Sequence, residues 1–283
     1  MEVDLDLSGS LDEPTRRARA DLLWERHLLV FRGQALDFDQ QVDVMTCFGP
    51  ISRDDGEPAP RDFVSLDPSI GITGTSRLPF HRDLSFSPLP LIALSLYGLD
   101  VEPAVTSTLF VDSTQVFRQL PAELRDRLDG MDALHVFPNA KGYGEAYVRS
   151  TAPGGEPFDL RFPNTAHPLV FRHPQTGEPI LFVCEQTDRI VGLADVDSEE
   201  LMTTLFEHTY APDNVLEHWW EPGDLVIWDN LAVQHGRADQ SAVARRTLRR
   251  VVCGEASFFE QHPQMRFQSG ADPYGDAPVL VDD

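Results

Sequence analysis

Basic residues are scarce in this chain of 283 residues. Its 23 Lys and Arg side chains stand against 46 Asp and Glu side chains, so the formal net charge is −23 with histidine neutral. Binding to a nucleic-acid backbone or to an anionic membrane surface requires a basic face that neutralises phosphates. The composition therefore argues against nucleic acids and membranes as partners.

Cysteines are few, and long apolar runs are missing. The three cysteines lie far apart and form no C-x-x-C pair, which argues against a disulfide framework and against a thiolate zinc site. The most apolar stretch, 89–99, contains Pro90 and Gly98 and is too short to cross a bilayer, and the N-terminus lacks the features of a secretory signal. We therefore expect a soluble protein of the reducing cytoplasm.

The remaining composition is that of a globular protein. Hydrophobic residues make up 41% and charged residues 24% of the chain, which is ordinary for a folded domain. There is no internal repeat and no shift in composition. We expect one domain over 1–283, with a lid inserted at about 138–166 and a C-terminal tail at about 256–283. The proposed lid has no apolar period and several Gly and Pro, and a connection of that length is more often functional than filler.

The order of predicted elements indicates a mainly β fold. Apolar spacing predicts a helix from residue 13 that leads into a buried strand, and a capping-box pattern at 37–40 opens a second helix. From residue 80 onward, short runs of β-branched and aromatic residues predict strands at 90–98, 107–112, 168–172, 179–184, 224–228 and 246–253, and a helix at 198–209. Because strands and helices do not alternate regularly, we expect a double-stranded β-helix, or jelly roll, with flanking helices.

The tripeptide His81-Arg82-Asp83 is the first candidate for a metal site. In an extended strand, residues i and i+2 point to the same face, so the His81 imidazole and the Asp83 carboxylate can meet at one ion. The alternative is coincidence, since nine histidines among 46 acidic residues place some His-x-Asp by chance.

A third ligand is available at His235. A Gly turn and a buried strand at 223–230 precede it. Two histidines and one carboxylate leave three neighbouring coordination positions open, an arrangement suited to non-haem Fe(II) that activates oxygen. The alternative is that His235 caps a turn and contacts only backbone.

Four of the few basic residues gather in the segment 245–250, Arg-Arg-Thr-Leu-Arg-Arg. In a strand, Arg246, Leu248 and Arg250 share one face, and Leu248 indicates that this face is partly buried. Two guanidiniums separated by about 13 Å of backbone would suit a dicarboxylate, or two anions. The alternative is a solvated stripe that pairs with the abundant carboxylates of the chain.

Together these motifs resemble the taurine/2,4-dichlorophenoxyacetate dioxygenase (TauD/TfdA) family of Fe(II)- and 2-oxoglutarate-dependent oxygenases. The resemblance rests on His81-x-Asp83, on Gly-Asp-Leu-Val-Ile-Trp-Asp-Asn at 223–230, on His235-Gly236 and on the arginine strand, in that order and spacing. Leu-Val-Phe-Arg-Gly-Gln at 29–34 and Phe48-Gly49 add to it. It covers about residues 15–255.

The resemblance implies the cofactors and the chemistry. His81, Asp83 and His235 would bind Fe(II), with 2-oxoglutarate and O2 as co-substrates and succinate and CO2 as products. Hydroxylation of an unactivated C–H bond is the default outcome, and desaturation, epoxidation and cyclisation remain open. Halogenation is disfavoured, because Asp83 occupies the position that a halide would need.

Further residues match the family one by one. Arg246 would pair with the distal carboxylate of 2-oxoglutarate, assisted by the hydroxyl of Thr108, and Arg250 matches an arginine near the metal that touches the anion of acidic substrates. The chain departs from the family pattern at Val105-Thr106, where Gly-Gly is common, and at Leu231, where arginine is common. The family's substrate-binding histidine after Phe-Gly is also absent from 50–55, which argues against taurine as the substrate.

The substrate is expected to be a small, carboxylate-bearing metabolite, such as an amino acid or an intermediate of secondary metabolism. Expected lining residues are Arg53, Phe80 with its neighbours 78–79, and, in the lid, Tyr143, Tyr147, Arg149 and Arg161. The remaining histidines, His27 and His173 among them, are expected to be structural or exposed. We also expect a homo-oligomer, either a dimer or a tetramer. The rival interpretations are a non-catalytic jelly-roll module that binds metal or a small acid for regulation, and an acidic partner-binding domain without metal.

Overall fold

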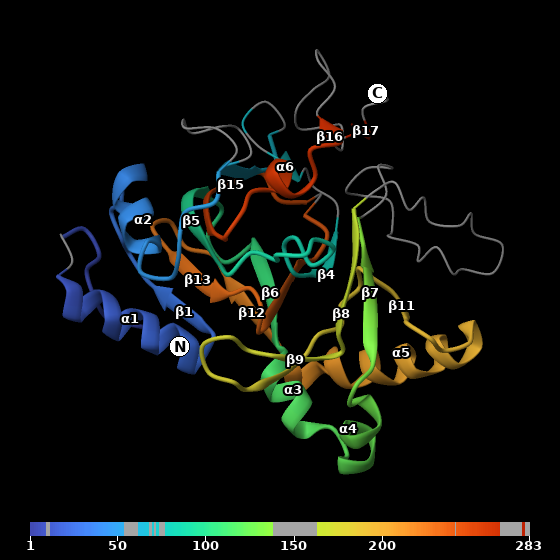
Figure 1. Cartoon of the computed structure of the whole chain (residues 1–283). Coiled ribbons are helices and arrows are strands. Elements are labelled where there is room, and N and C mark those ends of the chain that lie inside the picture. The colour runs from blue at the N-terminus through green and yellow to red at the C-terminus, as the bar shows by residue number, and fades with distance from the viewer. Residues whose placement is uncertain are drawn as a thin grey trace.

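The computed structural model describes residues 1–9, 12–53, 62–67, 70, 72–73, 77–137, 163–240, 242–266 and 279–280. Over these residues the chain forms mostly antiparallel sheets, with helices packed outside them (Figure 1). The prediction of a mainly β fold is therefore confirmed. None of the described helices is long and apolar enough to cross a membrane.

The larger sheet has six strands in the order β1-β13-β5-β15-β2-β3. Its neighbouring strands are antiparallel except for β2 and β3, which run parallel. The bounds are β1 Leu28–Phe31, β2 Phe63–Ser65, β3 Ile72–Thr73, β5 Ala93–Val101, β13 Leu225–Asp229 and β15 Arg246–Cys253. The central strand β5 begins three residues later than expected from the sequence, because Pro90 and Leu91 precede the first ladder residue.

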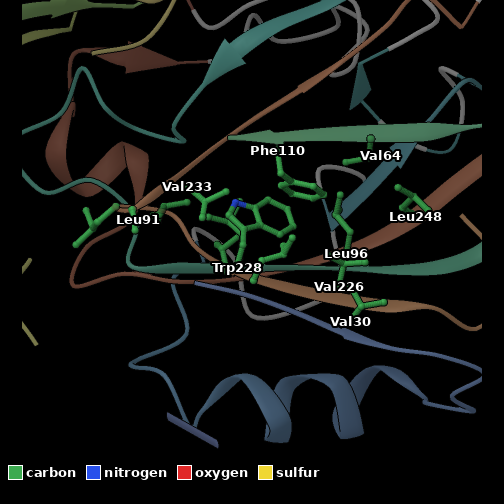
Figure 2. Packing of buried hydrophobic residues seen from close by; sticks show 14 of the residues in the cluster. Val30, Val64, Leu91, Leu96, Phe110, Val226, Trp228, Val233 and Leu248 are labelled. Carbon is green, nitrogen blue, oxygen red and sulfur yellow. The ribbon is translucent and has the colours of Figure 1, made fainter. Parts of the chain in front are cut away.

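The smaller sheet has four strands in the order β12-β6-β14-β4. Their bounds are β4 Leu78–His81, β6 Ser107–Asp112, β12 Val215–Trp219 and β14 Val233–Arg237. A hydrophobic core with side chains from both sheets lies between them (Figure 2). In it the rings of Phe110 from β6 and Trp228 from β13 meet edge to face, with centroids 5.4 Å apart. The two facing sheets form the sandwich that positions the site.

Helices α1 (Glu13–Arg26) and α2 (Phe38–Met45) cover the outer face of the larger sheet. Both begin at caps that the sequence indicates. Asp12 accepts a hydrogen bond from the backbone of Thr15, and Asp37 and Gln40 form a complete capping box. Apolar side chains of both helices, such as Leu23 and Met45, pack on this face.

A second set of elements covers the outer face of the smaller sheet. These elements are α3 Ser113–Gln119, α4 Ala122–Leu128, α5 Asp195–Thr209, the three-stranded sheet β11-β7-β8 (Thr187–Ile190, Asp132–Val136, Asn164–Pro168) and the pair β9 Val170–Arg172 with β10 Pro179–Leu181. Their apolar side chains form a separate core with Phe80 and Val111. Sequence patterns did not predict α3 and α4, which are only seven residues long each.

The remaining elements are η2 Pro212–Asn214, α6 Phe258–Gln261 and the strand pair β16 Met265–Arg266 with β17 Val279–Leu280. The structure also describes parts of the expected lid and of the expected C-terminal tail. The end of the expected lid, about 138–166, overlaps β8, which starts at Asn164 and pairs with β7. The rest of that segment, 138–162, lies outside the described residues. Part of the expected tail is structured, since α6 begins with a capping box from Ser257 to Glu260.

Candidate active site

Three side chains from two neighbouring strands converge at one point. His81 ends β4, Asp83 follows two residues later, and His235 of β14 pairs directly opposite His81. Nε2 of His81 lies 3.3 Å and Nε2 of His235 lies 3.6 Å from Oδ1 of Asp83. One ligand atom from each residue lies within 4.8 Å of the others. The structure thus brings together the three predicted metal ligands.

The His81 ring is oriented by its own strand. Its Nδ1 lies 2.8 Å from the carbonyl oxygen of Pro79, which accepts a hydrogen bond only from a protonated Nδ1. This contact leaves the lone pair of Nε2 directed at the site, as a metal-binding histidine requires. The His235 ring packs against both its partner and the core, with its centroid 4.2 Å from that of His81 and 4.8 Å from that of Trp228.

Asn230 holds the backbone of Asp83. The Asn230 side chain accepts a hydrogen bond from the amide of Asp83 at 2.9 Å and donates one to its carbonyl at 3.0 Å. It also donates to the carbonyl of Leu91 at 2.8 Å. Asp83 follows the end of β4, so this side chain replaces the ladder bonds that a strand would supply.

Asp229 supports the turn that carries Asn230. One carboxylate oxygen accepts hydrogen bonds from the amides of Leu231 and Ala232, and the other lies 2.6 Å from Nε2 of the buried His173. The Trp-Asp-Asn motif therefore has three separate roles. Trp228 packs on His235, Asp229 shapes the turn, and Asn230 fixes the segment of Asp83.

Arg250 pairs with the second oxygen of Asp83. Its Nη2 lies 2.5 Å from Oδ2, while Oδ1 faces the two histidines. Burial favours the neutral acid, but Arg250 and the two histidines outweigh it and hold the pKa of Asp83 well below its usual range. The carboxylate is therefore ionised at neutral pH, as a metal ligand must be.

His235 is kept neutral by its surroundings. Burial and the neighbouring His81 lower the pKa of His235 to about 3, although Asp83 acts in the opposite direction. A neutral imidazole is the form that coordinates metal. Together, one ionised carboxylate and two histidines form a donor set that fits a divalent transition metal with three sites left for other ligands.

One hydroxyl connects the two ligand-bearing strands on the face opposite the site. Oγ of the buried Ser113 accepts a hydrogen bond from Nη2 of Arg82 at 2.6 Å and one from Nε2 of Gln234 at 3.0 Å. Arg82 stands between the two ligands at the end of β4, and Gln234 directly precedes the ligand on β14. The position of His81 and Asp83 is thus linked to the position of His235.

A second polar group lies deeper in the sandwich. Nη2 of Arg246, on β15, donates to Oγ1 of Thr108 on β6 at 3.1 Å, and the indole N–H of Trp220 donates to the same oxygen at 3.0 Å. Arg246 is only 3% exposed, and its Nε and Nη1 have no hydrogen-bond partner among the described residues. Burial lowers the pKa of this guanidinium well below its ordinary value. These donors could bind a carboxylate.

The alternation predicted for the arginine strand is present in β15. Leu248 lies in the core between the sheets, and Arg246 and Arg250 make their contacts on that same side. Arg249 points the opposite way and bonds to the side chain of Gln41 on α2. Two arginines of the strand therefore reach the interior, as predicted, and the solvated stripe is excluded.

Other expected lining residues lie elsewhere. Phe80 was expected to line the substrate site, and the structure places its ring in a separate hydrophobic core. It precedes His81 and so points to the opposite face, where its ring stacks on Tyr210 with centroids 4.8 Å apart. Arg53 pairs with Asp62 and lies over the ring of Phe38. The four lid candidates lie outside the described residues, namely Tyr143, Tyr147, Arg149 and Arg161.

Three residues of the site escaped the sequence reasoning. Ser113 and Trp220 are common residue types, and nothing local marks them as partners of Arg82 and Thr108. Arg237 gave a usable signal, because it follows His235 by two residues and strand alternation places it on the same face. It is 2% exposed.

Comparisons with known proteins agree with this geometry. The family described as "Taurine catabolism dioxygenase TauD, TfdA family" matches residues 2–252. An alpha-ketoglutarate-dependent 2,4-dichlorophenoxyacetate dioxygenase from Cupriavidus pinatubonensis is 30% identical over 274 residues, which cover 88% of this chain and 92% of that protein. Pentalenolactone F synthase from Streptomyces arenae is 33% identical over 192 residues, which cover 65% of this chain and 64% of that protein.

Solved structures show the same fold. A taurine dioxygenase from Burkholderia xenovorans superposes with a TM-score of 0.70 at 24% identity, over 98% of this chain and 90% of that one. AAD-2, solved with Mn(II) and N-oxalylglycine, superposes with a TM-score of 0.70 at 23% identity, over 89% of this chain and 92% of that one. The expected jelly-roll core is therefore confirmed. The chain belongs to the TauD/TfdA family and is a dioxygenase dependent on 2-oxoglutarate, which is the alpha-ketoglutarate of those names.

Proposed function

We propose that this protein uses Fe(II), 2-oxoglutarate and O2 to hydroxylate an unactivated C–H bond of a small anionic metabolite. The observation that carries the proposal is the convergence of His81, Asp83 and His235 in one sandwich with the buried guanidinium of Arg246. A non-catalytic module that binds metal or a small acid would require either the three metal-binding side chains or the buried guanidinium of Arg246. It would not require both. A metal-independent acidic domain would need neither.

Fe(II) is the metal that this donor set favours. Two imidazoles and one carboxylate on one face, with three positions open, are typical of iron sites that bind a chelating co-substrate and oxygen. Bound iron would supply an oxidant that inserts one oxygen atom of O2 into the C–H bond, while the other enters succinate as 2-oxoglutarate loses CO2. The residues around it are proposed to bind and orient the reactants.

Arg246 and Thr108 are proposed to bind the distal carboxylate of 2-oxoglutarate. Thr108 Oγ1 already accepts two hydrogen bonds, so its own O–H is left to donate. Arg246 still has unpartnered donors, and its planar fork suits a carboxylate. The surrounding core of Phe110, Trp228 and Leu248 is apolar and keeps this charge pair away from water.

An anionic substrate is supported by Arg250 and by a relative. The Arg250 side chain is 21% exposed beside Asp83, so it remains within reach of a ligand in the site. The relative that is named for 2,4-dichlorophenoxyacetate acts on a carboxylate. Desaturation, epoxidation and cyclisation share the first step with hydroxylation, and product analysis distinguishes them. We further propose that the protein is a cytoplasmic homo-oligomer, either a dimer or a tetramer. Light scattering would measure the mass of the oligomer.

The test starts under anaerobic conditions. Adding Fe(II) and 2-oxoglutarate to the protein should give the weak visible charge-transfer band of the chelate, and succinate should form when air is admitted. Carboxylate metabolites are then screened for increased succinate release, and the product of any hit is identified by mass spectrometry. Absence of an iron-dependent band in the wild-type protein would overturn the proposal.

Two variants make the test specific. Asp83→Ala removes a proposed ligand and should abolish both the band and the turnover. Asp100→Asn removes an exposed carboxylate of β5, which is paired with Arg245, and should leave both intact. Full turnover in Asp83→Ala would refute the assignment of the metal site.

A further inference from the structure

The segment that follows Asp83 has an unfavourable backbone conformation. Residues 84–91, called here the Asp83 loop, connect Asp83 to the segment that enters β5. Leu84, the first residue of the loop, has a φ of 58°, which is the left-handed region that leucine rarely adopts. Such a conformation persists only where surrounding contacts hold it. The contacts of the Asp83 loop therefore help to determine the direction of the Asp83 carboxylate.

The base of the Asp83 loop is closed by its own hydrogen bonds. The amide of Leu91 donates to the carbonyl of Asp83 at 3.3 Å, and the Asn230 side chain donates to the carbonyls of both residues. Inside the loop, the amide of Ser87 donates to the carbonyl of Leu84 at 3.0 Å. The outer part of the loop, from Ser87 onward, must be held by other segments.

Helix α6 and the residue after it hold this outer part. Gln261, the last residue of α6, accepts a hydrogen bond from the amide of Leu89 and donates one to its carbonyl, both at 2.9 Å. The side chain of Gln261 thus pairs with Leu89 as a neighbouring strand would. His262 is 6% exposed, and its Nε2 lies 2.7 Å from Oγ of the fully buried Ser87.

Apolar contacts join the same two segments. Phe86 of the Asp83 loop lies in a small hydrophobic core with Met265, and Phe258 of α6 packs against this core. The rings of Phe86 and Phe258 meet edge to face, with centroids 6.3 Å apart. Phe86 and Met265 are both buried. The C-terminal segment 257–265 is therefore packed on the loop.

Strand β8 holds the loop as well. Oγ1 of Thr165 donates to the carbonyl of Phe86 at 2.9 Å, and Nε2 of His167 lies 3.1 Å from the carbonyl oxygen of Ser87. β8 lies inside the part of the chain that matches the family, whereas α6 follows residue 252, where that match ends. Family membership therefore accounts for β8 and leaves α6 without a role.

We propose that Gln261 and His262 are positioning residues for the proposed metal ligand Asp83, and that the segment 257–265 is a working part of the metal site. This inference rests on the proposed function, because it assumes that Asp83 binds the metal. Neither residue contacts the metal, and both act through the Asp83 loop.

The conformation of Leu84 explains how a contact at the outer part of the loop reaches the site. When α6 no longer holds Ser87 and Leu89, the loop is free to let Leu84 return to a negative φ. That rotation turns the neighbouring Asp83 carboxylate away from the two histidines. The affinity for metal then falls, although all three proposed ligands are still present.

The experiment titrates the apoprotein with Mn(II) by calorimetry and records the visible spectrum of bound Co(II). Gln261→Met keeps the length of the side chain and removes both bonds to Leu89, and His262→Phe keeps a ring and removes the bond to Ser87. Each should weaken Mn(II) binding about threefold to tenfold and change the Co(II) spectrum. His262→Gln keeps a polar group that can bond to Ser87 and should recover the lost affinity.

Two further variants serve as controls. Gln264→Met makes the same substitution at an exposed glutamine of the same segment and should bind Mn(II) like the wild type. Ser87→Ala removes the bond to His262 from the side of the loop, so it tests the same contact if His262→Phe does not fold. Combining the two substitutions should weaken binding no further than either alone, because both remove one contact.

A merely structural role for α6 predicts a different result. Gln261→Met and Ser87→Ala would then lose stability in urea, or show no change, while the Mn(II) affinity and the Co(II) spectrum stay those of the wild type. That result would overturn the inference and leave the proposed function standing. Failure of the wild-type protein to bind Mn(II) and Co(II) would overturn both.

Discussion

Arg250 and Asp83 form an ion pair that divides the two oxygens of the carboxylate. Oδ2 accepts from Nη2 of Arg250 at 2.5 Å, whereas Oδ1 lies between Nε2 of His81 and Nε2 of His235. The guanidinium thus holds one oxygen and leaves the other directed at the histidines. A carboxylate held in this way is prepared to bind a metal through a single oxygen.

Replacing Arg250 should therefore weaken metal binding. In Arg250→Met the carboxylate loses the partner that orients it and keeps it ionised, and such changes around a metal ligand typically cost about tenfold to a hundredfold in affinity. Calorimetric titration of the apoprotein with Mn(II) measures this loss. An unchanged Mn(II) affinity would contradict the role of the ion pair. Arg249→Met, on the other face of β15, provides a control for the loss of an arginine from this strand.

Ser113→Ala should loosen the link between the two ligand-bearing strands. The substitution removes the one oxygen that accepts from both Arg82 and Gln234, so His235 should no longer be held in register with the other two ligands. We expect about tenfold weaker Mn(II) binding and a changed spectrum of bound Co(II). Ser113→Thr keeps the hydroxyl and should preserve both. A variant that loses stability but keeps its Co(II) spectrum would show that the hydroxyl is merely structural.

Strand periodicity explains how much of the site could be predicted from the sequence. His81 with Asp83, and Arg246 with Arg250, are pairs at even spacing, and even spacing places side chains on one face whatever the rest of the fold does. Local patterns also located the caps of α1 and α2. These features depend only on nearby residues, so they are visible in the sequence.

Features that depend on register between strands could not be predicted. The pairing of Gly236 with Leu109 joins segments more than 100 residues apart. The same limit applies to Ser113, whose partners, Arg82 and Gln234, come from two distant segments. Phe80 illustrates strand alternation. It is next to His81 in the sequence, but its side chain points to the opposite face of the strand and stacks on Tyr210.

Asn230→Ala should destabilise the protein and weaken metal binding together. The substitution leaves the amide and carbonyl of Asp83 and the carbonyl of Leu91 without their side-chain partner. An unsatisfied buried polar group costs about 1–3 kcal/mol, so unfolding in urea should show a loss of at least that size. Saturating Mn(II) should recover less stability in the variant than in the wild type, because the Asp83 segment is no longer fixed. Equal stabilisation by Mn(II) in both proteins would contradict this coupling.

A buried charge cluster away from the metal site should make stability depend on pH. His27 directly precedes β1 in a left-handed conformation, with φ of 58°. Its Nδ1 lies 3.2 Å from Asp112, and its Nε2 lies 3.8 Å from Glu178. The ring centroid of His173, whose Nε2 contacts the carboxylate of Asp229, lies 6.2 Å from that of His27. Burial opposes protonation of His27, but Asp112, Asp229 and Glu178 outweigh it and raise the pKa of His27.

A raised pKa in the folded state means that protonated His27 stabilises the fold. This stabilisation is complete below the unfolded pKa of about 6.5 and is lost as the pH rises through the folded value, which lies higher. We therefore expect His27→Asn, whose side chain tolerates a positive φ, to be less stable than the wild type at pH 6, with a smaller difference at pH 9. Urea midpoints of both proteins at several pH values test this, with His208→Asn on α5 as the control. If the difference stays constant from pH 6 to pH 9, the His27 charge contributes nothing, and the loss in the variant reflects packing alone.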